Sequence, residues 1–208
     1  MCRAAADGNK AAVELLIDTF GSVNFERYCG DIQGWGEGEI SPLNAAIIGS
    51  RSAADDAALS HYEIVTLLIK AKANVLSGTW YDGSRYDTVC DGFVSPHYIG
   101  DVYVASCFSR SGPIMAALLN ATRCDTEELS EYLFRAVGNE NIEHVKLLLA
   151  HKADPNLHSR KLEEGYRFTC SCKCLYRSCL MSAIASPTTP FEIISSLINA
   201  KADVHRIR

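Results

Sequence analysis

The sequence has no apolar run long enough to cross a membrane. Apolar stretches such as residues 45–48 and 147–150 fall far short of the roughly 20 residues that span a bilayer. The first residues, Met1-Cys2-Arg3-Ala4, also contain no apolar segment typical of a secretory signal. We therefore expect no membrane insertion and an intracellular, cytoplasmic protein.

The sequence also has no excess of positive charge and no catalytic motif. It carries 20 Lys and Arg against 25 Asp and Glu, for a formal net charge of −5. Binding to nucleic acid without regard to sequence needs a basic face, so we expect no nucleic-acid partner. The six histidines show neither an H-E-x-x-H pair nor the spacing of a catalytic triad, and we expect no enzyme.

Cysteine, in contrast, is abundant. There are nine in 208 residues, an odd number. Without a secretory signal the thiols are expected to be reduced, which excludes a disulfide framework. Five cysteines are scattered along the chain, whereas four crowd into residues 170–179.

A short apolar pattern recurs along the chain. Aliphatic residues at positions i, i+3 and i+4 follow a small or polar residue, which is typical of one face of a short helix. The four copies that show it best span residues 13–17, 63–69, 143–149 and 192–198.

Each copy is flanked by two further repeated features. Three copies continue into a matched tail, Lys72-Ala73-Asn74, Lys152-Ala153-Asp154 and Lys201-Ala202-Asp203, which fits an exit turn. A second helical stretch rich in small residues precedes them and lets two antiparallel helices pack closely. In the second copy it opens with Ser41-Pro42, an N-cap hydroxyl followed by proline at the first helical position.

These motifs together resemble the ankyrin repeat, a unit of about 33 residues with a T-P-L-H opening and an E-I-V-x-L-L-L second helix. Ser41-Pro42-Leu43-Asn44 and residues 63–69 match that pattern well. The resemblance implies an all-α solenoid of paired antiparallel helices with extended β-turn fingers, formed by residues 1–208 as a single array. The predicted repeats lie near 1–28, 40–77, 95–125, 128–157 and 178–208.

The spacing of the repeats departs from the family. Successive second helices are 52, 51, 29 and 49 residues apart, so three gaps hold many extra residues. In the second repeat about ten of them, residues 51–60, are expected between its two helices. The remainder lies mainly in three long fingers, at residues 24–39, 74–94 and 156–177.

Aromatic residues gather in these fingers. They hold 10 of the chain's 18 aromatics, including both tryptophans, in 59 residues, where a uniform spread would give about half as many. The rings either pack into small satellite cores or form anchors on a binding surface, and long ordered loops favour the second interpretation.

The resemblance implies a non-catalytic module that binds a protein partner through its concave face and fingers. The candidate contact residues combine finger aromatics with neighbouring arginines: Trp35, Trp80, Tyr81, Arg85, Tyr86, Tyr166 and Arg167. Because neither end shows a distinct polar cap, we also expect the residues to belong to a longer protein.

The cysteine cluster supports an alternative function. On an extended strand, alternate residues share a face, and four thiolates close a tetrahedral zinc site. A redox switch and ordinary thiols are the competing interpretations, since the usual C-x2-C knuckle is absent. No cofactor is expected in the main interpretation; in the alternative, the zinc ligands are Cys170, Cys172, Cys174 and Cys179.

Overall fold

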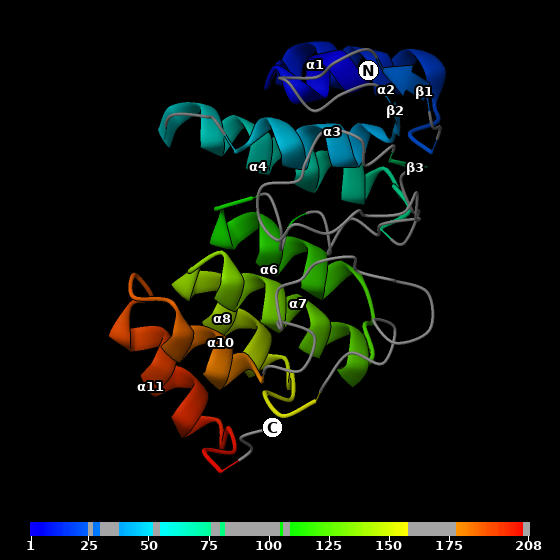
Figure 1. Ribbon diagram of the computed structural model, residues 1–208. Coiled ribbons are helices and arrows are strands. Elements are labelled where there is room, and N and C mark those ends of the chain that lie inside the picture. The colour runs from blue at the N-terminus through cyan, green and yellow to red at the C-terminus, as the bar shows by residue number, and fades with distance from the viewer. Residues whose placement is uncertain are drawn as a thin grey trace. The chain divides into compact units, whose positions relative to one another are not determined.

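The computed structural model describes residues 1–24, 27–29, 38–51, 55–75, 80–81, 105, 109–157 and 178–205. In that part of the chain, helices joined by turns make up almost all of the regular structure (Figure 1). The helices are α1 (Cys2–Ala6), α2 (Lys10–Phe20), α3 (Pro42–Gly49), α4 (Asp55–Lys70), α6 (Gly112–Ala121), α7 (Thr126–Gly138), α8 (Ile142–Ala150), α10 (Cys179–Ala185) and α11 (Phe191–Asn199). The strands are β1 (Arg27–Cys29), β2 (Gly38–Ile40) and β3 (Trp80–Tyr81).

The chain divides into two compact units. Unit 1 comprises Met1–Tyr86 and Val94–Thr122, and unit 2 comprises Asp87–Phe93 and Arg123–Arg208. Unit 1 therefore contains α1 to α6 and the three strands, whereas unit 2 contains α7 to α11.

Unit 1 is a stack of paired helices. The first helices α1 and α3 pack on each other, the second helices α2 and α4 do the same, and α6 packs on α4. Ile64 and Leu68, which lie four residues apart in the predicted second helix, are completely buried. The spacing of the apolar pattern thus selects the face of α4 that enters the core.

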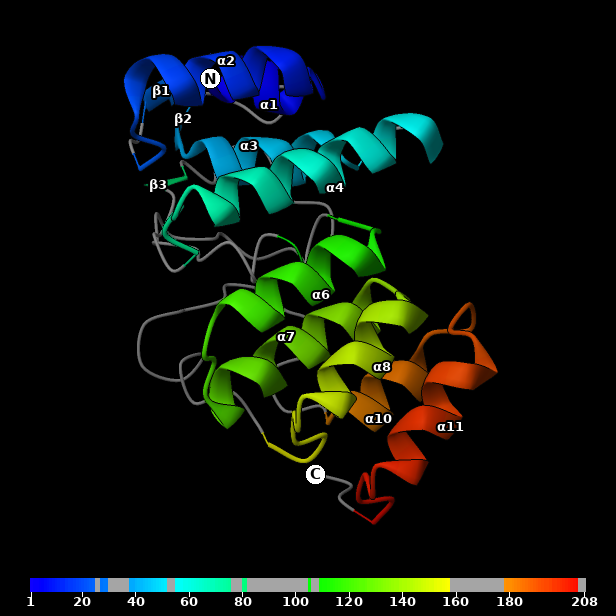
Figure 2. The same cartoon turned by 180° about the vertical axis from the view of Figure 1, so that it is seen from behind.

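Unit 2 repeats this arrangement with two helix pairs. Helix α7 pairs with α8 and α10 with α11, while α7 contacts α10 and α8 contacts α11 (Figure 2). The apolar core includes Leu133 from α7, Leu148 from α8 and both Ile193 and Leu197 from α11, all with no exposed surface.

Side-chain caps fix where most of these helices begin. Ser41 is the N-cap of α3, where its hydroxyl accepts a hydrogen bond from the Asn44 amide at 3.1 Å and Pro42 follows. This confirms the start predicted from the Ser-Pro pair. Helix α7 begins with a capping box, in which the Asp125 and Glu128 side chains each accept the other residue's backbone N–H.

Helix α4 begins earlier than the repeat pattern predicts. The repeat pattern predicts an insertion between two helices at residues 51–60, but Asp55 already starts the helix, which reaches 16 residues. That prediction is wrong for residues 55–60. Acidic residues in a first turn complement the helix dipole, and the Ala-Ala-Leu segment that follows has high helix propensity, so the insertion extends α4 by further turns.

Several helices end in a left-handed residue that is not glycine. The sequence Leu68–Ala73 shows the pattern: the Lys72 amide donates to the Ile69 carbonyl at 3.0 Å and the Ala73 amide to the Leu68 carbonyl at 2.9 Å. These two bonds define a Schellman motif, whose left-handed position glycine usually occupies. The non-glycine residues at such positions, with φ between 55° and 70°, are Lys72, Glu140, Lys152 and Lys201.

Candidate functional site

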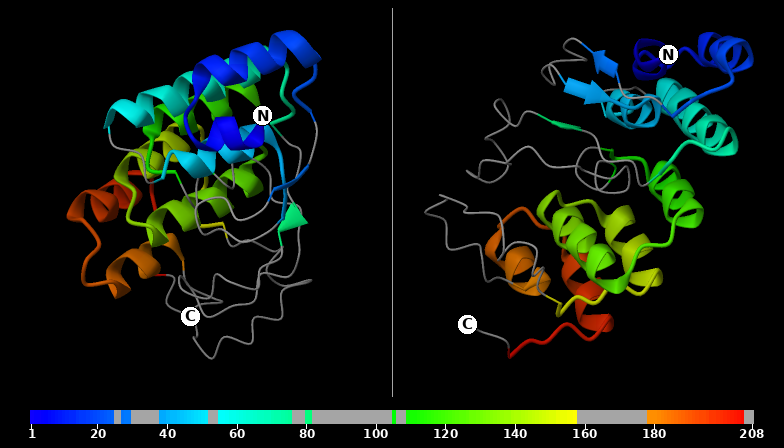
Figure 3. Two further views of the ribbon diagram at one scale, coloured as in Figure 1. Left: turned by 90° about the horizontal axis from the view of Figure 1, so that it is seen from above. Right: turned by 90° about the vertical axis from the view of Figure 1, so that its right-hand side faces the viewer.

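Two of the predicted fingers join in one small antiparallel sheet. Strands β1 and β2 come from the finger at residues 24–39 and β3 comes from the finger at residues 74–94, with the strand order β1-β2-β3 (Figure 3). Tyr28 pairs with Glu39, which in turn pairs with Trp80, while Gly38 pairs with Tyr81. Backbone hydrogen bonding therefore connects fingers that are some 40 residues apart in the sequence.

The structure places two of the seven predicted contact residues in this sheet. Trp80 and Tyr81 form β3, in agreement with the preference of aromatic residues for strands. The other five lie outside the described residues, and their role stays a prediction: Trp35, Arg85, Tyr86, Tyr166 and Arg167.

Asparagine side chains tie the exit turns of successive repeats together. The Asn24 amide group donates to the Lys72 carbonyl at 2.9 Å, and its oxygen accepts from the Asn74 backbone N–H at 2.7 Å. Asn156 makes the same pair of bonds, to the Lys201 carbonyl at 2.9 Å and from the Asp203 N–H at 2.7 Å. The two contacts align the base of each finger with the next repeat.

We expect Asn24→Ala and Asn156→Ala each to lower the free energy of unfolding by about 1–2 kcal/mol, because each loses two hydrogen bonds that a single side chain makes. Urea unfolding followed by circular dichroism measures the change. Asn199→Ala is the matched control, since that side chain is exposed at the end of α11. Equal stability of all three variants would show that water replaces these bonds without loss.

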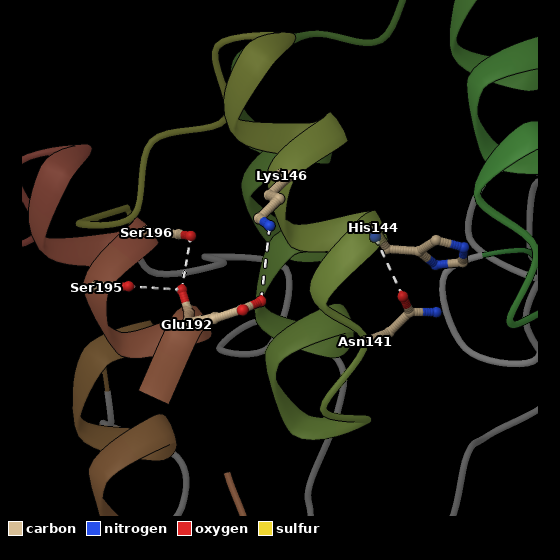
Figure 4. Close-up of polar contacts among 6 residues, drawn as sticks. All are labelled: Asn141, His144, Lys146, Glu192, Ser195 and Ser196. Atoms are coloured by element: carbon tan, nitrogen blue, oxygen red, sulfur yellow. Dashed lines mark hydrogen bonds and ion pairs between the residues drawn. The ribbon is translucent and has the colours of Figure 1, made fainter. Parts of the chain in front are cut away.

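An ion pair links the second helices of unit 2, and serine hydroxyls bond within one of them. Lys146 of α8 lies 3.7 Å from the Glu192 carboxylate in the first turn of α11 (Figure 4). The hydroxyls of Ser195 and Ser196 donate to the Glu192 backbone carbonyl at 3.0 and 2.7 Å. Because both charged side chains are more than half exposed, the ion pair contributes little to stability and mainly orients the two helices.

Comparison with known proteins connects this architecture to a fold. No protein-family model matches the chain, and no curated protein matches its sequence. Among solved structures, the crystal structure of the human ASB11 ankyrin repeat domain matches 99% of this chain and 85% of its own, with a TM-score of 0.52 and 19% sequence identity. The chain has the ankyrin-repeat fold. The match confirms the predicted all-α architecture of paired helices.

His61, which lies near the start of the second-helix pattern, connects two successive repeats. His61 is 3% exposed, and its Nε2 lies 3.0 Å from the Ala6 carbonyl oxygen of the preceding repeat. The ring therefore joins α4 to α1 as a buried structural contact. No helix among the described residues is long and apolar enough to cross a membrane.

Cys179 is the one member of the proposed zinc set that lies among the described residues. It is the first residue of α10 and 2% exposed, within the ankyrin core. Burial raises the pKa of its thiol to about 12. Its burial among the core residues at the start of α10 supports a role in packing.

The zinc interpretation of the remaining cysteines stays a prediction. Cys170, Cys172 and Cys174 lie outside the described residues. Elsewhere in the described ranges, no group of three or more His, Cys, Asp or Glu side chains is placed to hold a metal ion. Elemental analysis of the purified chain tests the alternative, with one zinc per chain as the result that supports it.

Alkaline destabilisation is expected from Cys179. Its folded pKa of about 12 lies above the unfolded value, so its stabilising effect is complete below the unfolded pKa and is lost as the pH rises. Between about pH 9 and pH 10 the free energy of unfolding should fall by about 1 kcal/mol, approaching the limiting slope of about 1.4 kcal/mol per pH unit. Burial also raises the pKa of Tyr132, but an unfolded tyrosine titrates only above about pH 10.

Urea titrations at a series of pH values measure this slope. Cys179→Ala removes the titrating thiol. The free energy of unfolding of this variant should therefore vary less with pH between about pH 9 and pH 10, although it is lower than that of the wild type at neutral pH. Parallel curves for the wild type and the variant would contradict the assignment.

Proposed function

We propose that this chain is a non-catalytic protein-interaction module that binds a protein partner through the concave face of an ankyrin array and through its aromatic-rich fingers. The ankyrin fold is generally used for protein interaction and is typically non-catalytic. The observation that carries the proposal is the pairing of β2 with β3, which joins two fingers in one sheet. We further propose that residues 1–208 form one array that acts inside the cell, where nine cysteines stay reduced.

The paired fingers supply what a recognition surface needs. Trp and Tyr dominate the binding energy of protein interfaces, and Trp80 and Tyr81 lie in the strand that the second finger contributes. A finger that is held by backbone hydrogen bonds loses less conformational entropy on binding than a free loop. Strand pairing therefore favours contact through the fingers over contact through isolated loops.

Loss of the finger aromatics should weaken partner binding by at least about tenfold, which corresponds to about 1.4 kcal/mol. The test captures partners from lysate on the wild-type chain and then measures the dissociation constant of each purified partner for wild type and for a Trp80→Ala, Tyr81→Ala variant. Circular dichroism must first show that the variant is folded.

Phe191→Ala serves as the matched control, because Phe191 is 78% exposed on α11 and lies outside the fingers. The proposal predicts that this variant binds like the wild type. If the finger variant also keeps the wild-type dissociation constant, the rings pack locally and the partner binds elsewhere on the array.

A further inference from the structure

The turn between α10 and α11 contains two candidate phosphoacceptor sites within five residues, Ser186-Pro187 and Thr189-Pro190. Protein kinases of the proline-directed class modify a Ser or Thr hydroxyl when proline follows it, because the proline ring removes a backbone N–H and restricts the backbone at that position. Four of the chain's six prolines follow Ser or Thr, at Ser41-Pro42, Ser95-Pro96, Ser186-Pro187 and Thr189-Pro190.

The dipeptides differ in how far their residues are exposed to a kinase. Ser41 is 7% exposed, and its hydroxyl is engaged as the cap of α3, so a kinase cannot reach it in the folded chain. In the turn between α10 and α11, Pro187 is exposed, and Ser186 and Thr189 are half-buried. Ser95-Pro96 lies outside the described residues.

Three hydroxyls of this turn converge on one carboxylate of the preceding repeat. The Glu140 Oε1 atom accepts hydrogen bonds from Ser186 at 2.8 Å, from Thr188 at 2.6 Å and from Thr189 at 3.3 Å. We call these four residues the Glu140 clamp. Glu140 lies in the turn between α7 and α8, so the clamp connects the two helix pairs of unit 2.

A phosphate cannot take the place of a hydroxyl in this clamp. The hydroxyl donates a hydrogen bond to the carboxylate, whereas a phosphate at neutral pH carries about 1.5 to 2 negative charges and presents mainly acceptor oxygens. Hydrogen bonds from Thr188, and then from Ser186, keep the pKa of Glu140 below its ordinary value, so its carboxylate is ionised. A phosphate on Ser186 or Thr189 would therefore face a full negative charge at close range.

The nearby helix end does not reverse this balance. Helix α11 begins after Pro190 without a side-chain cap, and its amides favour an anion. That attraction amounts to about half a charge, whereas Glu140 carries a whole charge; Glu192 in the first turn of α11 is paired with Lys146 and adds little to either side. Repulsion prevails, and the turn moves away from Glu140.

We propose that a proline-directed protein kinase phosphorylates Ser186 and Thr189, and that this modification opens the Glu140 clamp between the two helix pairs of unit 2. In the transfer, the hydroxyl oxygen forms a bond to the γ-phosphorus of ATP. The bond from that phosphorus to the bridging oxygen breaks, its electron pair leaves with ADP, and the hydroxyl proton passes to the kinase's base. The inference does not depend on the proposed partner binding.

The first test incubates the full chain with a purified proline-directed kinase and Mg-ATP, and maps phosphate by tandem mass spectrometry. Phosphate is expected on Ser186 and Thr189 and not on Ser41. Pro187→Ala should abolish modification of Ser186, and Pro190→Ala that of Thr189. Thr188→Ala is the matched control: it loses a clamp hydroxyl but keeps both dipeptides, so its modification should be at least as fast as in the wild type.

A synthetic peptide of residues 183–193 controls for the kinase itself. The proposal is overturned if the kinase does not modify the peptide, or if it modifies the peptide fully but leaves both sites of the folded chain untouched.

The second test measures opening of the clamp by hydrogen exchange of two amides. The Thr189 amide donates to the Ser186 carbonyl in the turn, and the Ile193 amide donates to the Pro190 carbonyl at the start of α11. Phosphorylation should speed their exchange about tenfold in the wild type. In a Glu140→Lys variant the same phosphate meets an ammonium group, so phosphorylation should slow exchange. A change of the same sign in both chains would overturn the proposed role of Glu140.

Discussion

Gly49→Ala is expected to lower the free energy of unfolding of unit 1 by about 3 kcal/mol, the upper part of the range for an overpacked core. Gly49 is the last residue of α3, at the point where α1, α3 and α4 meet. A Cβ atom there would collide with the Ala6 carbonyl oxygen, and would lie 2.9 Å from the Ala6 carbonyl carbon and 2.7 Å from His61 Nε2.

No small side-chain rotation can relieve this collision. The nearest atoms belong to backbone and to a buried ring, neither of which can rotate away as the tip of a long side chain does. Relief requires α1 to separate from α3, which also stretches the 3.0 Å contact between His61 and the Ala6 carbonyl. The substitution therefore weakens packing and a buried polar contact together.

Tryptophan fluorescence isolates this effect, because both tryptophans of the chain belong to the residues of unit 1. Gly138→Ala is the control, followed by circular dichroism because Gly138 belongs to unit 2: this glycine also ends a first helix, but nothing lies within 4 Å of a Cβ built on it. Alanine there should be neutral or stabilising by up to about 1 kcal/mol. A wild-type urea midpoint for Gly49→Ala would contradict the close packing of α1 on α3.

The sequence could predict the helices because their signals are local. The buried face of α4 follows from the aliphatic spacing around Ile64 and Leu68, and the first residue of α3 follows from Ser41-Pro42. Each signal lies within one or two helical turns, and the structure confirms both. The extension of α4 to Asp55 follows from helix propensity, which the repeat pattern does not contain, so the pattern alone places residues 51–60 between two helices.

The remaining features depend on contacts between distant residues. Strand β3 has only two residues, and it forms because β2, some 40 positions earlier, offers a free edge. The clamp at Glu140 likewise requires a turn 46 to 49 positions later in the chain. The Ser-Pro and Thr-Pro dipeptides were visible in the sequence, but only the structure shows which carboxylate their hydroxyls contact.

Replacing Lys72, Lys152 and Lys201 together by glycine is expected to raise the free energy of unfolding by about 2 kcal/mol. All three are exposed residues in left-handed conformation, with φ of 63°, 70° and 65°. A side chain there crowds the backbone, and glycine removes this strain at the cost of a more flexible unfolded chain, which leaves a net gain of somewhat under 1 kcal/mol per site.

The amide bonds that define these turns should survive the change, because the Lys72, Lys152 and Lys201 amides donate as part of the backbone. Lys70→Gly is the control, since Lys70 lies two residues earlier and within α4, where glycine should cost up to about 1 kcal/mol. A triple variant no more stable than the wild type would mean that the lysine side chains make contacts that offset their backbone strain.

Glu140→Gly distinguishes backbone strain from side-chain function at the same kind of turn. With φ of 55°, Glu140 should gain as much as the lysines from the loss of its side chain. Its carboxylate, however, accepts three hydrogen bonds from the next turn, whereas among the described residues the lysine side chains make no such set of bonds. We expect Glu140→Gly to lower the free energy of unfolding by about 1–2 kcal/mol, because hydrogen bonds to a charged group outweigh the relief of backbone strain.

Urea unfolding of the single variants measures the difference between Glu140→Gly and Lys152→Gly. If the two variants were equally stabilising, the clamp would contribute nothing to the fold, and its opening could not loosen unit 2.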